Sequence, residues 1–306
     1  SISRVLPGLH KGRTAVITGG SLGIGLQLGR FLAIAGARVL LSARSEGKLA
    51  EARDEIVDEL RNIGYPRPES RVTILGGIDV GDPDALDRLH DHAVAELGHV
   101  DFLINNAGIS GAEEMVVDMT RADWDRTMEA NLISNYSLIR KFSPAMKAGG
   151  RGSILNVSSY FGGEKYVAVA YPNRADYAVS KAGQRVLAEI LSRHLGPEIQ
   201  INALAPGPVD GARLRGSAEA PGLFDRRGLL VLENKRLNEV HKAILAGMSS
   251  GFSADDVMTL ASNAVEGIDI DALPKPIARL VLKIRDSGGL GTVSYTHLRA
   301  HETRLN

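Results

Sequence analysis

Cysteine is absent from the 306-residue sequence. Disulfide bonds, thiolate metal sites and a cysteine nucleophile are therefore excluded within this chain. The absence suits a reducing compartment, and we expect a cytoplasmic protein. His297 and His301 have helical spacing but no third ligand in register, so we expect no metal site.

The sequence also lacks an excess of charge, because Lys plus Arg and Asp plus Glu both number 36. Overall charge therefore gives no reason to expect nucleic acid or an anionic membrane as a partner. No apolar run approaches the roughly 20 residues that a membrane-spanning helix needs. We therefore expect the partner to be a small molecule whose charged groups are held locally.

Short β-branched runs alternate along the chain with longer stretches of helical periodicity. Apolar strands separated by helices are typical of a parallel sheet that is covered on both faces. We predict a three-layer α/β fold of the Rossmann type, with a doubly wound parallel sheet. The expected strands are 14–18, 39–42, 72–75, 102–105, 154–157 and 201–204, and the expected helices are 23–36, 46–62, 83–97, 121–147 and 176–195.

A glycine-rich turn, 18–25, follows the first expected strand and opens the first helix. Glycines allow a tight turn and close approach of the backbone to a pyrophosphate, and the helix N-terminus supplies free N–H groups. The context predicts a dinucleotide site, whereas a simple packing turn is the alternative. The residues expected to contact the cofactor here are Gly19, Ser21, Leu22, Gly23, Ile24 and Gly25.

The end of the second strand indicates which dinucleotide is bound. Sites for NAD usually place an acidic residue there to bind the ribose hydroxyl, but this sequence has Arg44 and no acid before Glu46. A guanidinium can hold a 2′-phosphate through paired, charge-assisted hydrogen bonds. We therefore predict NADPH, with a solvated Arg44 as the alternative.

Tyr177 and Lys181 lie four residues apart in an expected helix, and this spacing places them on one face. An ammonium beside a phenol favours the phenolate, so the phenol can give its proton to a carbonyl oxygen as hydride arrives. Such a pair is common by chance. It gains weight because Ser159 ends the fifth strand, where open α/β sheets place their sites.

Together these motifs resemble the short-chain dehydrogenase/reductase family, whose glycine turn reads TGxxxGxG. Further matching motifs are Asn105-Asn106-Ala107-Gly108, Asn156-Val157-Ser158-Ser159, the Tyr177–Lys181 pair and the turn Pro206-Gly207. The resemblance implies a homo-oligomer and assigns catalysis to Asn131, Ser159, Tyr177 and Lys181. It also implies that the cofactor contacts Tyr177 and Lys181 together with Asp79, Val80, Asn106, Ala107, Gly108, Pro206, Gly207 and Val209.

One departure from the family pattern is the gap of 18 residues between Ser159 and Tyr177, which is longer than usual. Tyr171 lies closer to Ser159, but position 175 is Ala, so only Tyr177 has its lysine. We expect the extra residues, within 163–174, to form a loop at the mouth of the site. Segments 131–136, 158–165, 171–177 and 195–202 resemble the C-terminal half of the bifunctional malonyl-CoA reductases.

That closer resemblance implies NADPH-dependent reduction of malonyl-CoA to malonate semialdehyde, with release of CoA, in a chain that is part of a larger protein forming 3-hydroxypropionate. The free carboxylate of a malonyl group needs a cation. The candidates are Lys165, Arg174, Arg213 and Arg215, each of which could equally be surface charge. Two other functions stay open: an ordinary ketone or aldehyde reductase of the family, and a cofactor-binding fragment without catalysis.

Beyond the sixth strand, β-branched runs no longer alternate with helical stretches, and no last strand of the sheet is recognisable. We expect the sheet to be truncated before it. The expected organisation is a linker over 1–10, an NADP-binding reductase domain over 11–250 with substrate loop and helices over 208–250, a helical extension over 251–292, and a tail over 293–306 that resembles translated adapter sequence.

Overall fold

The computed structural model describes residues 8–163, 172–207, 209, 216–217 and 220–221. The chain forms two compact units, Ser1–Val209 and Asp210–Asn306. In the second unit, strands β7 (Gly216–Ser217) and β8 (Ala220–Pro221) pair in an antiparallel fashion. Several predicted parts lie outside the described residues: the first seven residues of the expected linker over 1–10, the helices expected up to residue 250, the extension, the tail and any last strand.

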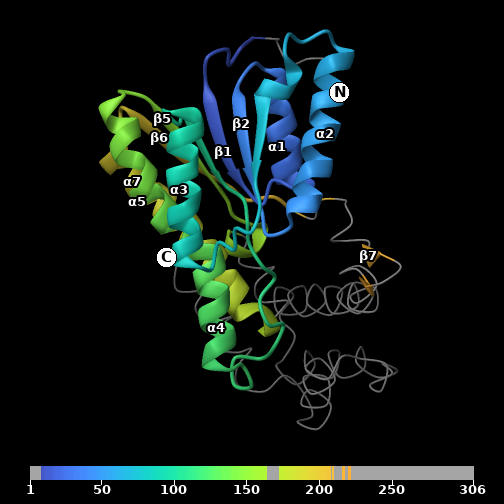
Figure 1. The fold of residues 1–306 in the computed structure, drawn as a ribbon. Helices are drawn as coiled ribbons and strands as arrows, with labels where there is room; N and C mark the ends of the chain where they lie inside the picture. Colours follow the sequence, from blue (N-terminus) through green and yellow to red (C-terminus); the bar gives the residue numbers. More distant parts are fainter. Residues whose placement is uncertain (1–7, 164–171, 208, 210–215, 218–219, 222–306) are drawn as a thin grey trace, which may run out of the picture. The chain divides into compact units, whose positions relative to one another are not determined.

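The first unit contains a parallel sheet in the order β3-β2-β1-β4-β5-β6 (Figure 1). This order confirms the predicted Rossmann-type α/β fold. The order reverses direction between β1 and β4, which is where such sheets bind their ligands. The strands are β1 (Thr14–Thr18), β2 (Arg38–Ser42), β3 (Val72–Leu75), β4 (Phe102–Asn105), β5 (Gly152–Val157) and β6 (Ile199–Leu204).

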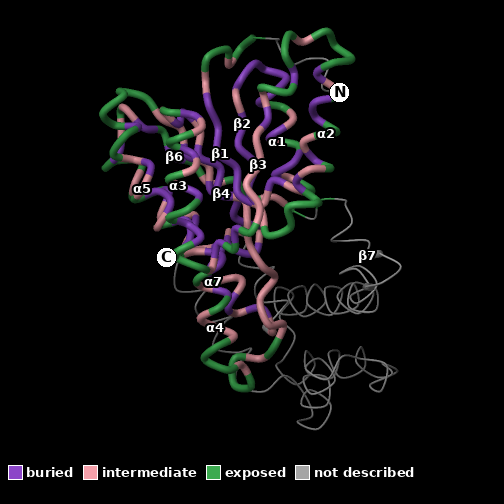
Figure 2. The backbone as a smooth tube through the Cα atoms, in the orientation of Figure 1, coloured by how far each residue is buried: buried purple, intermediate pink, exposed green. Residues whose placement is uncertain are grey.

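Each face of the sheet is covered by its own set of helices (Figure 1). Successive strand residues point to opposite faces. Ala15 and Ile17 therefore pack with helices α1 and α2, whereas Val16 packs with α3, α5 and α7. Figure 2 shows that the central strands β1, β2 and β4 are mostly buried. The helices are α1 (Gly23–Ile34), α2 (Glu46–Asn62), α3 (Pro83–Leu97), α5 (Ser134–Ala148) and α7 (Ala175–Leu195).

The prediction of one continuous helix over 121–147 is wrong in one respect. The structure divides it into α4 (Arg121–Met128), a π-helical turn η3 (Glu129–Ile133) and α5. A π-turn inserts an extra residue into the helical ladder and is frequent at functional sites. Helical periodicity does not reveal it, because the apolar face continues on both sides. Short 3₁₀ turns are η2 (Pro68–Arg71), η4 (Tyr160–Gly162) and η5 (Pro172–Arg174).

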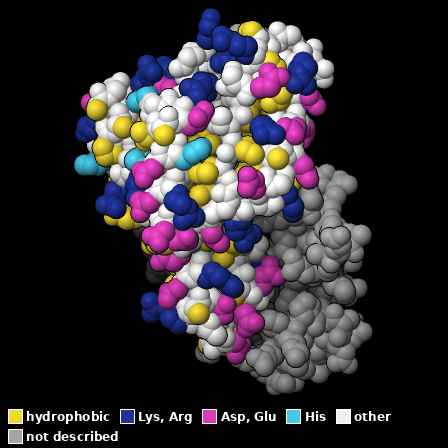
Figure 3. Space-filling model, in the orientation of Figure 1, with side chains coloured by type: hydrophobic (Ala, Val, Ile, Leu, Met, Phe, Trp, Pro, Cys, Tyr) yellow, Lys and Arg dark blue, Asp and Glu magenta, His cyan; other side chains and the backbone are white. Residues whose placement is uncertain are grey.

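Charges of both signs are interspersed over the described surface shown in Figure 3. This distribution agrees with the balanced composition and shows no field of one sign. None of the helices in the described part of the chain is long and apolar enough to span a membrane.

A buried carboxylate, Asp101, joins the starts of three strands at the sheet end opposite the glycine turn. It is only 3% exposed and accepts hydrogen bonds from Arg13 Nη1 (2.7 Å), Arg151 Nε (2.7 Å) and the backbone N of Thr14 (3.0 Å). Burial acts to raise the pKa of Asp101, but the bonds from Arg13 and Thr14 and the charge of Arg151 outweigh it and leave the pKa below its usual value.

We expect Asp101→Asn to lower the free energy of unfolding by about 2 kcal/mol at neutral pH, because charge-assisted hydrogen bonds are lost. Since folding lowers the pKa of Asp101, its stabilisation is complete above the unfolded-state pKa, near 4, and disappears as pH falls through the folded-state pKa. Urea unfolding at neutral and acidic pH measures this difference. Asp58→Asn, which removes an exposed partner of Arg61, is the control. Equal losses of stability in Asp101→Asn and Asp58→Asn would contradict the stabilising role of the Asp101 carboxylate.

Candidate active site

The glycine turn is tightly packed on its inner side and open on its outer side. An added Cβ at Gly25 would overlap the carbonyl oxygen of Gly19 and lie 2.5 Å from Asn106 Nδ2. Gly19 and Gly23 have φ values of +66° and +57°, which favour glycine. A Cβ at Gly23 would meet no atom within 4 Å. The open space beside the start of α1 fits the predicted pyrophosphate.

The segment after β4 is locked to this turn through Thr18. The Thr18 hydroxyl accepts hydrogen bonds from the backbone N of Asn106 and of Ala107, both at 3.1 Å. Asn106 Nδ2 donates in return to the carbonyl oxygens of Thr18 and Gly19, both at 3.0 Å. Two predicted cofactor segments are thus held together where the strand order reverses.

The remaining predicted cofactor residues of the first half lie at the carboxyl ends of neighbouring strands. Arg44 is exposed just after β2, and no acidic side chain in the described part of the chain pairs with it. Asp79 is also exposed, and its Oδ1 accepts from Gly81 N at 3.0 Å. Val80 is buried in the core. In the glycine turn, Ser21 and Ile24 are half-buried and Leu22 is exposed.

Lys181 is a buried cation, 4% exposed, on α7. Its Nζ donates to the carbonyl oxygen of Val157 at 2.8 Å and to Gln184 Oε1 at 3.2 Å. The same Nζ lies 5.8 Å from the centre of the Tyr177 ring. The ammonium is therefore fixed between the end of β5 and the Tyr177 ring.

Asn131 is fully buried in the π-turn η3. Its Oδ1 accepts from Ile109 N at 2.8 Å, and its Nδ2 donates to Ile109 O at 3.1 Å and to Ser180 Oγ at 3.0 Å. A Cβ added to Gly108 would lie 2.8 Å from Asn131 Oδ1 and 3.5 Å from Lys181 Nζ. Asn131 and Lys181 therefore converge on Gly108.

Ser159 reaches the site through the turn η4. Its Oγ accepts from Phe161 N at 3.3 Å, and the Phe161 ring stands edge-on to the Tyr177 ring with centroids 5.7 Å apart. A Cβ on Gly162 would overlap the backbone of Lys181. Because η4 lies directly against α7, the structure brings together Ser159, Tyr177, Lys181 and, through η3, Asn131.

The turn after β6 adjoins the same place, since Tyr160 N donates to Pro206 O at 3.1 Å. Gly207 and Val209 are exposed beyond it.

Sequence reasoning missed two buried polar residues at this centre. Gln184 accepts from Lys181 and donates from Nε2 to the carbonyl oxygen of Asn131. Its signal was its position three residues after Lys181, on the same helix face. Asp176 precedes Tyr177 and is fully buried. Carboxylates are common in the first turn of helices, so the sequence alone did not mark Asp176 as part of the site.

Among the four cations predicted for the substrate, only Arg174 belongs to the described residues; Lys165, Arg213 and Arg215 lie outside them. Arg174 is buried in η5, and its Nη1 forms an ion pair with Glu113. Its guanidinium carbon lies 4.9 Å from the centre of the Tyr177 ring. The loop expected within 163–174 thus ends in a 3₁₀ turn that leads into α7, while 164–171 lie outside the described part.

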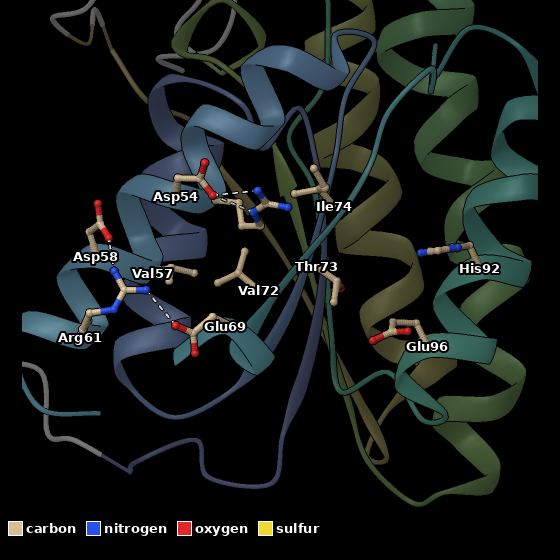
Figure 4. Close-up of a pocket in the computed structure, with 11 residues that line it drawn as sticks. Asp54, Val57, Asp58, Arg61, Glu69, Val72, Thr73, Ile74, His92 and Glu96 are labelled. Carbon is tan, nitrogen blue, oxygen red and sulfur yellow. Dashed lines mark hydrogen bonds and ion pairs between the residues drawn. The ribbon is translucent and has the colours of Figure 1, made fainter. Parts of the chain in front are cut away.

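A separate hollow of about 780 Å³ lies along β3, between α2 and α3 (Figure 4). Val72, Thr73 and Ile74 contribute from the strand, and Arg61 in its wall pairs with Asp58 and Glu69. None of the predicted catalytic or cofactor residues lines it. The hollow is therefore separate from the candidate active site.

Comparison with known proteins decides the family. The short chain dehydrogenase family matches residues 13–221. The chain belongs to the short-chain dehydrogenase/reductase family. The 7α-hydroxysteroid dehydrogenase of Escherichia coli K12 is 34% identical over 199 residues, which are 65% of this chain and 71% of that enzyme.

Two solved structures are also similar. The C-domain of a bacterial malonyl-CoA reductase, solved with NADP, is 51% identical with a TM-score of 0.71, covering 92% of this chain. The match spans only 43% of that longer chain. A metagenomic short-chain oxidoreductase in complex with NADP is 32% identical with a TM-score of 0.57, covering 65% of this chain and 84% of its own. The chain is therefore an oxidoreductase of this family, and both of these similar structures were solved with NADP.

We expect Gly25→Ala to weaken dinucleotide binding by at least about ten-fold, because the new Cβ must displace Gly19 or Asn106 from the turn. Fluorescence titration with NADPH measures the dissociation constant. Gly47→Ala is the matched control, since a Cβ at that helical glycine meets nothing within 4 Å. Unchanged binding in Gly25→Ala would show that the turn is not the cofactor cradle.

Proposed function

We propose that the chain reduces malonyl-CoA to malonate semialdehyde with NADPH and releases CoA. The observation that carries this proposal is the 51% identity over 92% of the chain to the C-domain of malonyl-CoA reductase. The curated relatives support only the broader class of carbonyl and alcohol oxidoreductases.

NADPH is favoured over NADH by the end of β2. Arg44 is exposed there, whereas the acid that would bind a ribose hydroxyl is missing. A guanidinium at this position suits a 2′-phosphate. When bound, NADPH supplies a hydride to the carbonyl carbon of the substrate. The glycine turn and the Asn106–Ala107 segment would hold its phosphates and nicotinamide half in place.

The protein's part is to stabilise the oxygen that becomes negative. The Ser159 hydroxyl and the Tyr177 phenol would donate hydrogen bonds to that oxygen, and the fixed Lys181 ammonium beside the phenol favours proton transfer from it. With a thioester, the product is a hemithioacetal. This intermediate collapses to the aldehyde because a thiolate leaves readily, a thiol pKa being near 8.5. A ketone offers no such leaving group and stops at the alcohol.

The test is turnover of malonyl-CoA with NADPH or NADH, following NADPH absorbance and free thiol together. We expect one thiol released per NADPH oxidised and slower reaction with NADH.

Tyr177→Phe should lose about 10²–10⁴-fold in kcat through loss of the general acid. Tyr171→Phe, which alters a tyrosine that has no lysine four residues later, should retain activity. Oxidation of NADPH by ketones or aldehydes, with no thiol release from malonyl-CoA, would favour the ordinary carbonyl reductase instead.

Arg174 is the described cation best placed for the malonyl carboxylate, because it lies beside the Tyr177 ring. We expect Arg174→Ala to raise KM for malonyl-CoA by about 10–100-fold, the value of a charge-assisted hydrogen bond, and KM for acetyl-CoA far less. Steady-state kinetics with both substrates measure this split. Glu113→Gln is the control, because it breaks the ion pair but keeps the cation. Equal effects of Arg174→Ala on both substrates would remove Arg174 from the substrate site.

A further inference from the structure

Asp176 is fully buried in the first turn of α7, directly before Tyr177. Its Oδ1 accepts a hydrogen bond from the backbone N of Tyr177 at 2.7 Å. Its Oδ2 accepts from Ala112 N at 3.0 Å and from Thr127 Oγ1 at 2.8 Å. One carboxylate therefore joins three segments that are distant in sequence: the catalytic helix, the chain after β4, and α4.

The surrounding chain is shaped to admit this carboxylate. Gly111 has φ of +84°, and a Cβ there would lie 2.5 Å from Asp176 Oδ2. Thr127 is completely buried, so its hydroxyl faces Asp176 instead of solvent. Burying a carboxylate is costly unless its oxygens are hydrogen-bonded, and here three donors satisfy them.

The same segment is tied to the start of α7 a second time. Asn173 Nδ2 donates to Glu113 O at 3.3 Å, and Arg174 pairs with the Glu113 side chain. Glu113 itself has φ of +59°, a conformation that non-glycine residues adopt mainly when the surroundings enforce it. Segment 111–113 and the residues that lead into Tyr177 are therefore held as one unit.

We propose that Asp176 is a positioning residue that fixes the first turn of α7, and with it the Tyr177 phenol, relative to Ser159 and Asn131. Further along the same helix, Lys181 and Gln184 already fix it to β5 and η3. Asp176 restrains the N-terminal end of this helix. The proposal rests on Tyr177 acting as the acid in the proposed reaction. Asp176 acts by positioning Tyr177 and does not itself contact the substrate.

Variants at both ends of the Asp176–Thr127 hydrogen bond test this role. Asp176→Ala should lower kcat by about 100-fold, since a displacement of roughly 1 Å has that effect, while KM for NADPH stays nearly unchanged. The kcat of Asp176→Asn should lie between those of the wild-type protein and Asp176→Ala, because the asparagine amide has only one acceptor oxygen for the three donors. Thr127→Val should lower kcat and Thr127→Ser should restore it. Thr120→Val, which removes the exposed cap of the same helix α4, should affect stability but not kcat.

Two outcomes separate this proposal from the proposed function. If the wild-type protein does not turn over malonyl-CoA but reduces another carbonyl compound, the substrate assignment fails and the same variants are compared on that compound. A wild-type kcat in Asp176→Ala on the accepted substrate would overturn the positioning role.

Amide hydrogen exchange tests the role without any substrate. In full-length Asp176→Asn, the amides of Ala112 and Tyr177 should exchange faster together, by at least about ten-fold, whereas those of α3 should be unchanged. Exchange at both positions that matches the wild-type protein would equally overturn the proposal.

Discussion

The buried ammonium of Lys181 is the constraint on which the site depends. A cation with 4% exposure is tolerated only when its hydrogen bonds are made, and here the end of β5 and Gln184 accept them. Gln184 in turn donates to the backbone of Asn131, so the π-turn is tied to the same point. The helix, the strand and the turn must therefore meet at one place for the ammonium to be satisfied. The catalytic geometry and the local stability are consequences of the same contacts.

The strands and most helices could be predicted from the sequence because burial on both faces leaves an unambiguous pattern. All five residues of β1 are buried, and their apolar run contrasts with the glycines that follow. The site segments were also predictable, because the carboxyl ends of parallel strands share one edge. Thr18, Asn106 and Ser159 each follow this rule. The hydrogen bonds between Thr18 and Asn106 add detail that the pattern alone does not contain.

What could not be predicted depends on contacts between segments far apart in sequence. The π-turn at Asn131 has no periodic signature, since it adds one residue inside an unbroken amphipathic stretch. The pairing of Asp176 with Thr127 joins residues 49 positions apart, and both look like ordinary helix residues. The ion pair of the buried Arg174 with Glu113 likewise joins residues 61 positions apart. Charge and spacing identify candidates, whereas their partners follow only from the fold.

The unusual length between Ser159 and Tyr177 is compatible with catalysis because each residue is anchored close to its own end of the chain that joins them. Ser159 is fixed by β5 and by the packing of Gly162 on the backbone of α7. Tyr177 is fixed by Lys181 on one side and Asp176 on the other. The closure entropy of a loop rises only slowly with its length, so residues can be added between two independently anchored ends at small cost. Residues can therefore be inserted at this point while Ser159 and Tyr177 keep their places.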